Sequence, residues 1–512
     1  MQTSDVRQDS RELRQLKWVI GTPYAVQGTS NLAYIPILYF IKFTLGMGDA
    51  GGQLFDSLRT SGWLIKPVWG LISDRLPLFG YHRKSWYVLM ACLALLFWTL
   101  SALLAALGIR IPVVYLLLFN LAFSTYAFVD VVCDALMVEQ GRRRGRVSAF
   151  VNFQWIVLAI ANAASMLLGG WFQQRIEGSD EAIWMIFLAT GLPPLVTAAV
   201  GLRYIQEEPV APHKRPPAPR VKITSWLRRA AQWGISRIRT LPQAWRHFRQ
   251  RHRVIWILML FLFFWKFSPS IGFIERSYLI DVRGFNPVSF GIILGVGSIT
   301  FLASLLAYNW VINHFPSVRW YHYLYAMVGI GVVSFPLSFF LYLDPSHPWW
   351  GLVAFDLPDA MNPLPSWNRY EWFRLMNQTV LGFATIPAFI IPLTIAGQTV
   401  QVQHAGVSYA LLMSLANVTD TLEGVVGAGL YKLFAQPGLA WLRETFQGSV
   451  FDIAKVSDDR TLILQMFVYI SLFFTVLTIP FIVLLKRDLA RQNIRIKLGS
   501  SETTPDIDGG SN

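Results

Sequence analysis

Long apolar runs recur through the whole 512-residue chain and constrain its fold more than any other feature. A helix needs about 20 mostly apolar residues to cross the hydrocarbon core of a bilayer, which is about 30 Å thick. Twelve runs reach that length, at residues 18–43, 52–73, 85–107, 112–138, 147–172, 182–204, 254–280, 287–312, 319–343, 374–399, 406–434 and 461–485. The runs are continuous, whereas membrane strands alternate apolar and polar residues. The sequence therefore predicts an all-α membrane protein with twelve transmembrane helices.

Composition and motifs narrow the class of protein further. Of the residues, 54% are hydrophobic and 14% are charged, whereas soluble domains hold about 25% charged residues. Cys92 and Cys133 both lie inside apolar runs, so they suit neither a disulfide framework nor a thiolate metal site. The histidines lack metal-ligand spacing, and the sequence has no phosphate loop of the ATPase type. We therefore expect no enzyme, no cofactor and no metal.

Lys and Arg are distributed unevenly among the connections between the runs. Short connections rich in these residues stay in the cytoplasm. With a cytoplasmic amino terminus, the inner connections hold 29 of them and the outer connections hold 7. We therefore expect a multi-pass protein of a cell membrane, with both termini cytoplasmic and the bacterial inner membrane as the setting. This topology accounts for the net charge of +14, so nucleic acid is not expected as a partner.

A basic, Pro-rich tract divides the runs six and six. The predicted organisation is a cytoplasmic segment 1–17, a six-helix half 18–204, a basic linker 205–253, a second six-helix half 254–485 and a cytoplasmic tail 486–512. Within the linker, Trp226 to Phe248 fits either an interfacial amphipathic helix or a solvated basic segment. Two similar halves around a central pathway are typical of secondary transporters, and we expect a monomer in the lipid bilayer.

The connection after the second run carries a specific motif. It reads Gly70-Leu71-Ile72-Ser73-Asp74-Arg75 and then Gly80-Tyr81-His82-Arg83-Lys84. This resembles the loop between the second and third helices of the major facilitator superfamily. An Asp and paired cations at fixed spacing can lock two helix ends and release them when the halves move. We therefore assign Gly70, Asp74, Arg75, Arg83 and Lys84 to a gating loop.

Further motifs resemble one family within that superfamily. They are Lys66-Pro67-Val68-Trp69-Gly70, Asp130-Val131-Val132-Cys133-Asp134-Ala135-Leu136, Ser268-Pro269-Ser270, Gly284-Phe285-Asn286-Pro287 and Ala410-Leu411-Leu412-Met413-Ser414. Together they resemble the folate-biopterin transporter family. The resemblance weakens over residues 344–372 and at His404-Ala405-Gly406-Val407. It implies a major facilitator fold and a transporter of a small polar solute, with folate or a pterin as the expected cargo.

Ionisable side chains within the apolar runs are the candidate site. Each costs about 2.5–3.5 kcal/mol to insert into a bilayer, so such groups usually line a pathway. A folate-like anion needs fixed cations for its carboxylates and aromatic faces for its ring. The expected substrate-binding residues are Tyr24, Asn31, Arg59, Lys66, Lys266 and Asn417. The expected proton-coupling residues are Asp130, Asp134, Asp420 and Glu423.

Structural roles are open for some of these carboxylates. Asp134 fits an ion pair with Arg75 or Arg83 of the gating loop as well as a coupling role. Asp420 and Glu423 fit ion pairs with Lys432 or Lys266. Other functions also remain: a carrier of another organic anion or of a cell-wall fragment, or a non-transporting membrane assembly factor. Proton-coupled carriage of a folate or pterin by alternating access is the leading hypothesis.

Overall fold

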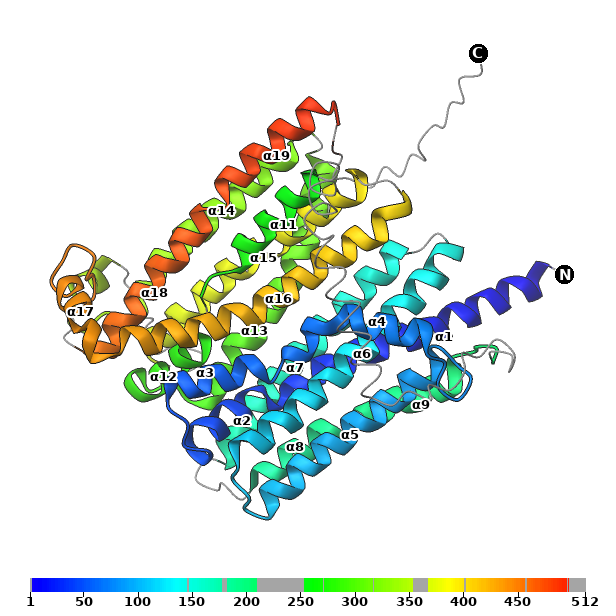
Figure 1. Cartoon of the computed structure of the whole chain (residues 1–512), viewed down its shortest axis with the longest axis horizontal. Helices are drawn as coiled ribbons and strands as arrows, with labels where there is room; N and C mark the ends of the chain where they lie inside the picture. Colours follow the sequence, from blue (N-terminus) through cyan, green and yellow to red (C-terminus); the bar gives the residue numbers. More distant parts are fainter. Residues whose placement is uncertain are drawn as a thin grey trace, which may run out of the picture.

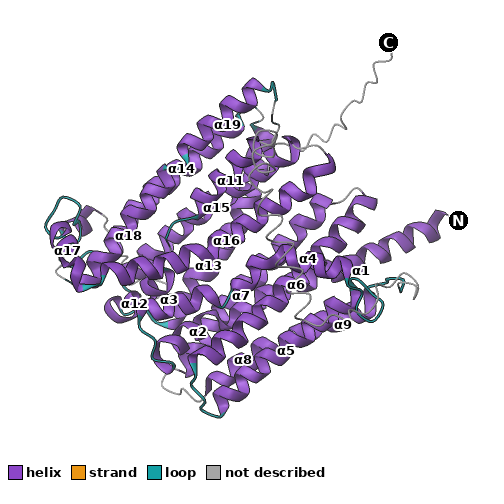
Figure 2. Ribbon diagram, viewed as in Figure 1, coloured by secondary structure: helices purple, strands orange, loops and turns teal. Residues whose placement is uncertain are grey.

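The computed structural model describes residues 2–144, 147–176, 182–209, 253–269, 271–315, 317–352, 367–399, 402–455, 458–494 and 496. These residues form a bundle of long helices (Figures 1 and 2), with one isolated bridge between Leu78 and Tyr81. The segment 226–248, where the sequence suggested an amphipathic helix, lies outside the described residues.

The N-terminal half contains the helices up to residue 204. They are α1 (Gln2–Thr29), η1 (Ser30–Ala33), α2 (Tyr34–Tyr39), the π-helical turn η2 (Phe40–Thr44), α3 (Asp49–Leu58), η3 (Ser61–Ile65), α4 (Lys66–Arg75), α5 (Lys84–Ala106), α6 (Pro112–Arg144), α7 (Val147–Ile176), α8 (Ile183–Gly191) and α9 (Pro194–Tyr204).

The C-terminal half contains the helices from residue 253 onward. They are α11 (Arg253–Lys266), α12 (Gly272–Arg283), α13 (Pro287–His314), α14 (Trp320–Leu337), η6 (Ser338–Leu341), η7 (Pro348–Leu352), α15 (Arg369–Thr399), α16 (Val402–Phe434), η9 (Pro437–Leu439), α17 (Ala440–Phe446), α18 (Asp459–Val476) and α19 (Ile479–Arg491).

The predicted apolar runs all fall on these helices. In the described part of the chain, eight helical stretches are long and apolar enough to cross a membrane. The other four predicted runs fold as α1 to η2, α3 to α4, α11 to α12, and α16. Three of these four are broken, and prolines explain part of this because they remove a backbone donor and disfavour helix before them. Pro269 separates α11 from α12, and Pro67 is the second residue of α4.

Some helices extend beyond the predicted runs. The segment predicted as cytoplasmic, 1–17, is helical from Gln2 onward and continues into the first run as α1. At its other end, α6 continues to Arg144, through most of the predicted inner connection. Hydropathy marks only the apolar length, and a helix with enough helix-forming residues continues past the bilayer core.

The first and the last described helices mark one end of the bundle. The start of α1 and the end of α19 lie at the same end of the bundle, on opposite sides of it, while α12 and α17 lie at the other end (Figure 1). Following the predicted topology, we call the first end the inner end and the second the outer end.

Glycines allow the two halves to approach closely along two seams. In the seam between α7 and α13, a Cβ on Gly170 would lie 2.5 Å from the Pro287 carbonyl oxygen. A Cβ on Gly291 would lie 2.8 Å from the Met166 carbonyl oxygen. In the seam between α3 and α16, a Cβ on Gly424 would lie 2.0 Å from Ser57 Oγ. Any larger residue at these positions would push the helices apart, as is typical of helix packing in membranes.

Candidate functional site

The first charged cluster lies inside the N-terminal half, where α4 and α6 meet α1. Lys66 Nζ donates to Asp130 Oδ2 at 2.5 Å, and the Tyr24 hydroxyl donates to Asp134 Oδ1 at 2.8 Å. Asp130 and Asp134 are four residues apart on α6, so both carboxylates lie on one helix face. The Lys66 ammonium is 4.7 Å from the centroid of the Trp63 ring. Two carboxylates thus share one ammonium, and Asp130 also lines a cavity between α1, α5, α6 and α9.

The second charged cluster lies inside the C-terminal half, between α11 and α16. Lys266 Nζ donates to both oxygens of Asp420, at 2.7 and 2.9 Å, and lies 5.8 Å from the Phe389 ring centroid. Lys266 is the last residue of α11, because Pro269 ends the helix there. Glu423 lies one turn beyond Asp420 and within electrostatic range of Lys266. Here again two carboxylates share one ammonium.

The face of α16 that carries Asp420 points toward the N-terminal half. Asp420, Gly424 and Tyr431 are spaced by four and seven residues, which places them on one helix face. Gly424 lies against Ser57 of α3, and the Tyr431 hydroxyl donates to Asp49 Oδ2 at 3.0 Å. The Asp420 carboxylate is 49% exposed. Asp420 therefore shares a face of α16 with residues that contact the other half.

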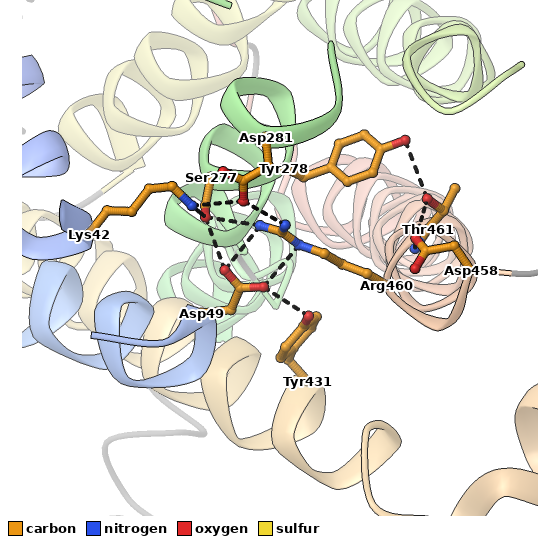
Figure 3. Close-up of polar contacts among 9 residues, drawn as sticks. All are labelled: Lys42, Asp49, Ser277, Tyr278, Asp281, Tyr431, Asp458, Arg460 and Thr461. Carbon is orange, nitrogen blue, oxygen red and sulfur yellow. Dashed lines mark hydrogen bonds and ion pairs between the residues drawn. The ribbon is translucent and has the colours of Figure 1, made fainter. Parts of the chain in front are cut away.

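A third cluster joins the halves at the outer end (Figure 3), and we name it the outer cluster. Its members are Lys42 and Asp49 of the N-terminal half with Ser277, Asp281, Tyr431 and Arg460 of the C-terminal half. Lys42 Nζ bonds Asp281 Oδ2 and Ser277 Oγ, each at 2.7 Å. Arg460 bonds Asp281 at 2.8 Å and Asp49 at 3.0 Å. Two cations and two carboxylates therefore balance each other across the interface.

A fourth group lies deeper, and we name it the arginine layer: Asp56 and Arg59 of α3 with Arg276 of α12. Arg59 is the residue that caps α3, and its Nε donates to Asp56 Oδ1 at 2.7 Å. Arg276 Nη2 donates to Asp56 Oδ2 at 3.0 Å, so one carboxylate bridges both halves. Asp56 follows Asp49 by seven residues, which places it about 10 Å farther along α3, and on α12 Arg276 directly precedes Ser277 of the outer cluster.

The gating-loop residues form a separate group at the inner end. Arg83 pairs with Asp74 at 2.6 Å and with Glu139 of α6 at 3.0 Å. Burial lowers the pKa of Arg83, but the hydrogen bonds and charges of Glu139 and Asp74 outweigh burial, so the pKa is raised overall. Arg83 therefore remains a cation that ties the loop to the end of α6. Arg75 is exposed.

Comparison with known proteins identifies the group to which this arrangement belongs. The model of the BT1 family matches residues 27–334, which is more than half of the chain. The chain belongs to the BT1 family. A folate-biopterin transporter of Synechocystis is 26% identical over 411 residues, covering 79% of this chain and 72% of that protein. Folate transporter 1 of Plasmodium falciparum is 30% identical over 146 residues, covering 27% of this chain and 28% of that protein.

Solved structures of low sequence identity share the fold of this BT1-family chain. The POT family transporter PepTSo matches with a TM-score of 0.62 and 12% identity, covering 94% of this chain and 99% of that one. The nucleoside transporter NupG matches with a TM-score of 0.55 and 14% identity, covering 93% of this chain and 98% of that one. The predicted major facilitator fold and the predicted resemblance to folate-biopterin transporters are confirmed. The protein is a multi-pass membrane transporter of a small-molecule solute, and not an enzyme.

The structure of this BT1-family chain brings together some predicted site residues and separates others. Asp134 bonds Tyr24, while Arg83 bonds Asp74 and Glu139, so the alternative pairing of Asp134 with the gating loop is wrong. The alternative pairing of Asp420 with Lys266 is the one that forms. Asn31 and Asn417 remain outside the charged clusters, and Asn417 Nδ2 is buried without a hydrogen-bond partner in the described residues. Gly70 packs near Val131 of α6, and Lys84 is the first residue of α5.

Several residues of the outer cluster were not predicted as site residues from the sequence. Lys42, Asp49, Asp281 and Arg460 stand at the ends of apolar runs, where charges normally reach the headgroups. Their pairing joins positions as far apart as Asp49 and Arg460, which are 411 residues apart. A search for cations and carboxylates of opposite halves at the same predicted membrane end would have found them.

Glu207 is another residue that the sequence did not single out. Its carboxylate accepts from the backbone N–H groups of His82, Arg83 and Lys84, at 2.7 to 3.3 Å. These groups precede or begin α5, where the positive end of the helix dipole favours an anion. Replacing Glu207 with Ala should therefore lower the free energy of unfolding by about 1–2 kcal/mol.

A thermal unfolding midpoint in detergent measures this effect of Glu207→Ala. The neighbouring Glu208 is exposed and serves as the matched control. Glu208→Ala should leave the midpoint unchanged. Equal midpoints for the two variants would show that the carboxylate does not stabilise the start of α5.

Proposed function

We propose that this protein carries a folate or a related pterin across the membrane by alternating access, coupled to protons. The observation that carries the proposal is the pair of ammonium–carboxylate clusters within the apolar spans, one in each half: Lys66 with Asp130, and Lys266 with Asp420. Charged groups within apolar spans usually serve a pathway, because lipid does not solvate them. The names of the curated relatives support folate or pterin as the cargo.

Proton coupling is supported by the composition of the two clusters. Each cluster contains two carboxylates and one ammonium: Asp130 and Asp134 with Lys66, and Asp420 and Glu423 with Lys266. With all groups ionised, each cluster has one excess negative charge in a low-dielectric region. A bound proton neutralises that charge and weakens the hold of a carboxylate on its lysine. Protonation can therefore release the lysine from its carboxylate partner in the protein, so that the lysine can bind an anionic cargo.

Alternating access is supported by the outer cluster and the glycine seams. The outer cluster joins the halves at one end of the bundle, so that end is closed by charged contacts (Figure 3). We propose that this state is open to the cytoplasm and that release of the outer cluster opens the other side. The predicted cytoplasmic termini and a bacterial inner membrane as the setting belong to the same proposal.

Uptake into proteoliposomes tests the function. The purified full chain is reconstituted, and the entry of labelled folate, labelled biopterin and an unrelated organic anion is measured with and without an inward proton gradient. We expect entry of folate or biopterin that exceeds entry into protein-free vesicles and that a protonophore reduces. Transport of the unrelated anion alone would assign another cargo. A folded protein that moves no solute would favour the assembly-factor alternative.

The second cluster yields a prediction in the same assay. Lys266→Ala and Asp420→Asn should each reduce folate uptake about tenfold, since each removes one partner of a charge-assisted pair. The effect is moderate because the two side chains are 27% and 49% exposed, so water compensates in part. Lys432→Ala, on the same helix but outside the cluster, is the matched control. Parent rates for both cluster variants would remove this pair from the pathway.

A further inference from the structure

The arginine layer has the features of an anion site that spans both halves. We propose that Arg59 and Arg276 together bind a carboxylate of the cargo, with Tyr34 against the adjacent part of the molecule. This inference rests on the proposed function, because it assigns the anionic end of a folate-like cargo to particular side chains. Arg276 is absent from the site predicted by the sequence.

The geometry places one aromatic ring beside two guanidinium groups. Arg59 Cζ lies 5.5 Å from the Tyr34 ring centroid, and Arg276 Cζ lies 5.2 Å from the same centroid. Arg59 also lies 5.1 Å from the Phe123 ring. Tyr34 is only partly buried. Tyr34 thus adds a partly exposed aromatic side chain to two fixed cations, a combination that suits a ligand that joins a ring system to a carboxylate.

The layer carries one more cation than it has carboxylates. Arg59 and Arg276 share the single carboxylate of Asp56. The adjoining pair, Arg374 with Glu275 at 2.8 Å, is balanced. The outer cluster, in contrast, has two cations and two carboxylates. One further anion would therefore neutralise the arginine layer, whereas the outer cluster is already neutral.

Hydrogen-bond donors remain available in the layer. A guanidinium has five N–H donors, and toward Asp56 the structure uses Nε of Arg59 and Nη2 of Arg276. Arg276 Nε is buried and has no hydrogen-bond partner among the described residues. The side chains of Arg276 and Asp56 are 15% and 18% exposed, so solvent reaches them, whereas Arg59 behind them is 4% exposed. A carboxylate can enter beside Asp56 and accept paired hydrogen bonds, the geometry that arginine favours.

The position of the layer links binding to movement of the halves. Arg59 belongs to the N-terminal half and Arg276 to the C-terminal half, and Asp56 joins them in the present state. A cargo carboxylate held by both arginines would compete with Asp56 for Arg276. Binding would then weaken one of the contacts between the halves, which is the kind of differential interaction that shifts a conformational equilibrium.

A comparison of two cargoes tests the inference. Folate carries carboxylates, and biopterin has a pterin ring without a carboxylate. Arg276→Gln and Arg59→Gln should each raise the folate concentration for half-maximal uptake about tenfold or more. Uptake of biopterin should change less than about twofold. Arg276→Lys, which keeps the charge but not the planar donor pair, should recover part of the folate affinity.

Arg175→Gln is the matched control, because Arg175 is exposed at the outer end of α7 and lies outside the layer. It should leave uptake of both cargoes unchanged. Equal losses of folate and biopterin uptake in Arg276→Gln and Arg59→Gln would overturn the inference and leave the layer a structural bridge between the halves. A parent protein that moves neither cargo would overturn the proposed function itself, and this result appears before any variant is compared.

Discussion

Asp130→Asn is expected to reduce folate uptake by about 100-fold or more. The substitution leaves the Lys66 ammonium without its partner at 2.5 Å, in a region where the two side chains are 16% and 6% exposed. Removing one partner of a buried ion pair costs about 3–5 kcal/mol, and Asp134, which is bonded to Tyr24, does not replace the lost hydrogen bond to Lys66. A free energy of about 3 kcal/mol or more corresponds to a factor of more than about 100 in an equilibrium constant. We therefore expect this variant to have the largest effect on transport in the N-terminal half.

The assay for Asp130→Asn is initial uptake into proteoliposomes, with the amount of folded protein measured in the same preparation. Asp344→Asn is the control, since Asp344 is exposed in the outer connection after η6. The double variant Lys66→Met with Asp130→Asn removes both charges and should fold at least as well as the single variant. If it also stays inactive, the charges serve transport and not only stability. Parent uptake by Asp130→Asn would remove Asp130 from the coupling pathway.

Arg460→Gln is expected to shift the protein away from the state that is closed at the outer end. Arg460 holds Asp49 of the N-terminal half and Asp281 of its own half, and the variant loses both ion pairs. Each charge-assisted hydrogen bond contributes about 1.5–3 kcal/mol. Loss of the bond that crosses the interface should therefore raise the ratio of outward-open to outward-closed molecules about tenfold or more.

Distances between spin labels on Phe43→Cys and Val282→Cys measure the opening, since both side chains are exposed near the outer cluster. The background carries Cys92→Ser and Cys133→Ala, because both native cysteines are free. Lys455→Gln, in the exposed connection before α18, is the control and should keep the parent distance. An unchanged distance distribution in Arg460→Gln would mean that the outer cluster does not hold this end closed.

The sequence predicted the features that depend on local composition. Apolar length predicted the spans, and the spacing of Gly70, Asp74 and Arg83 predicted a charged loop whose Asp74–Arg83 pair is present in the structure. The pairing of Asp130 with Asp134 on one face was also predictable, because a spacing of four on a helix fixes a common face.

The sequence did not predict partners that only the packing of the halves selects. The sequence assigned Lys66 to substrate binding and Asp130 to proton coupling. No sequence pattern near either residue showed that the two side chains bond each other. Arg276 had no signal, because an Arg near the end of an apolar run fits an interfacial position equally well. Its contact with Asp56 spans 220 residues of sequence, and only the docking of α12 against α3 creates it.

The glycine seam between α7 and α13 has a consequence for the speed of transport. Where Gly170 and Gly291 meet, backbone lies against backbone, and at this point no side chain stands between the helices. The activation barrier for exchanging access would then reside mainly in the electrostatic contacts at the outer end. Turnover should consequently respond more steeply to ionic strength, which screens charges, than to changes in lipid chain length.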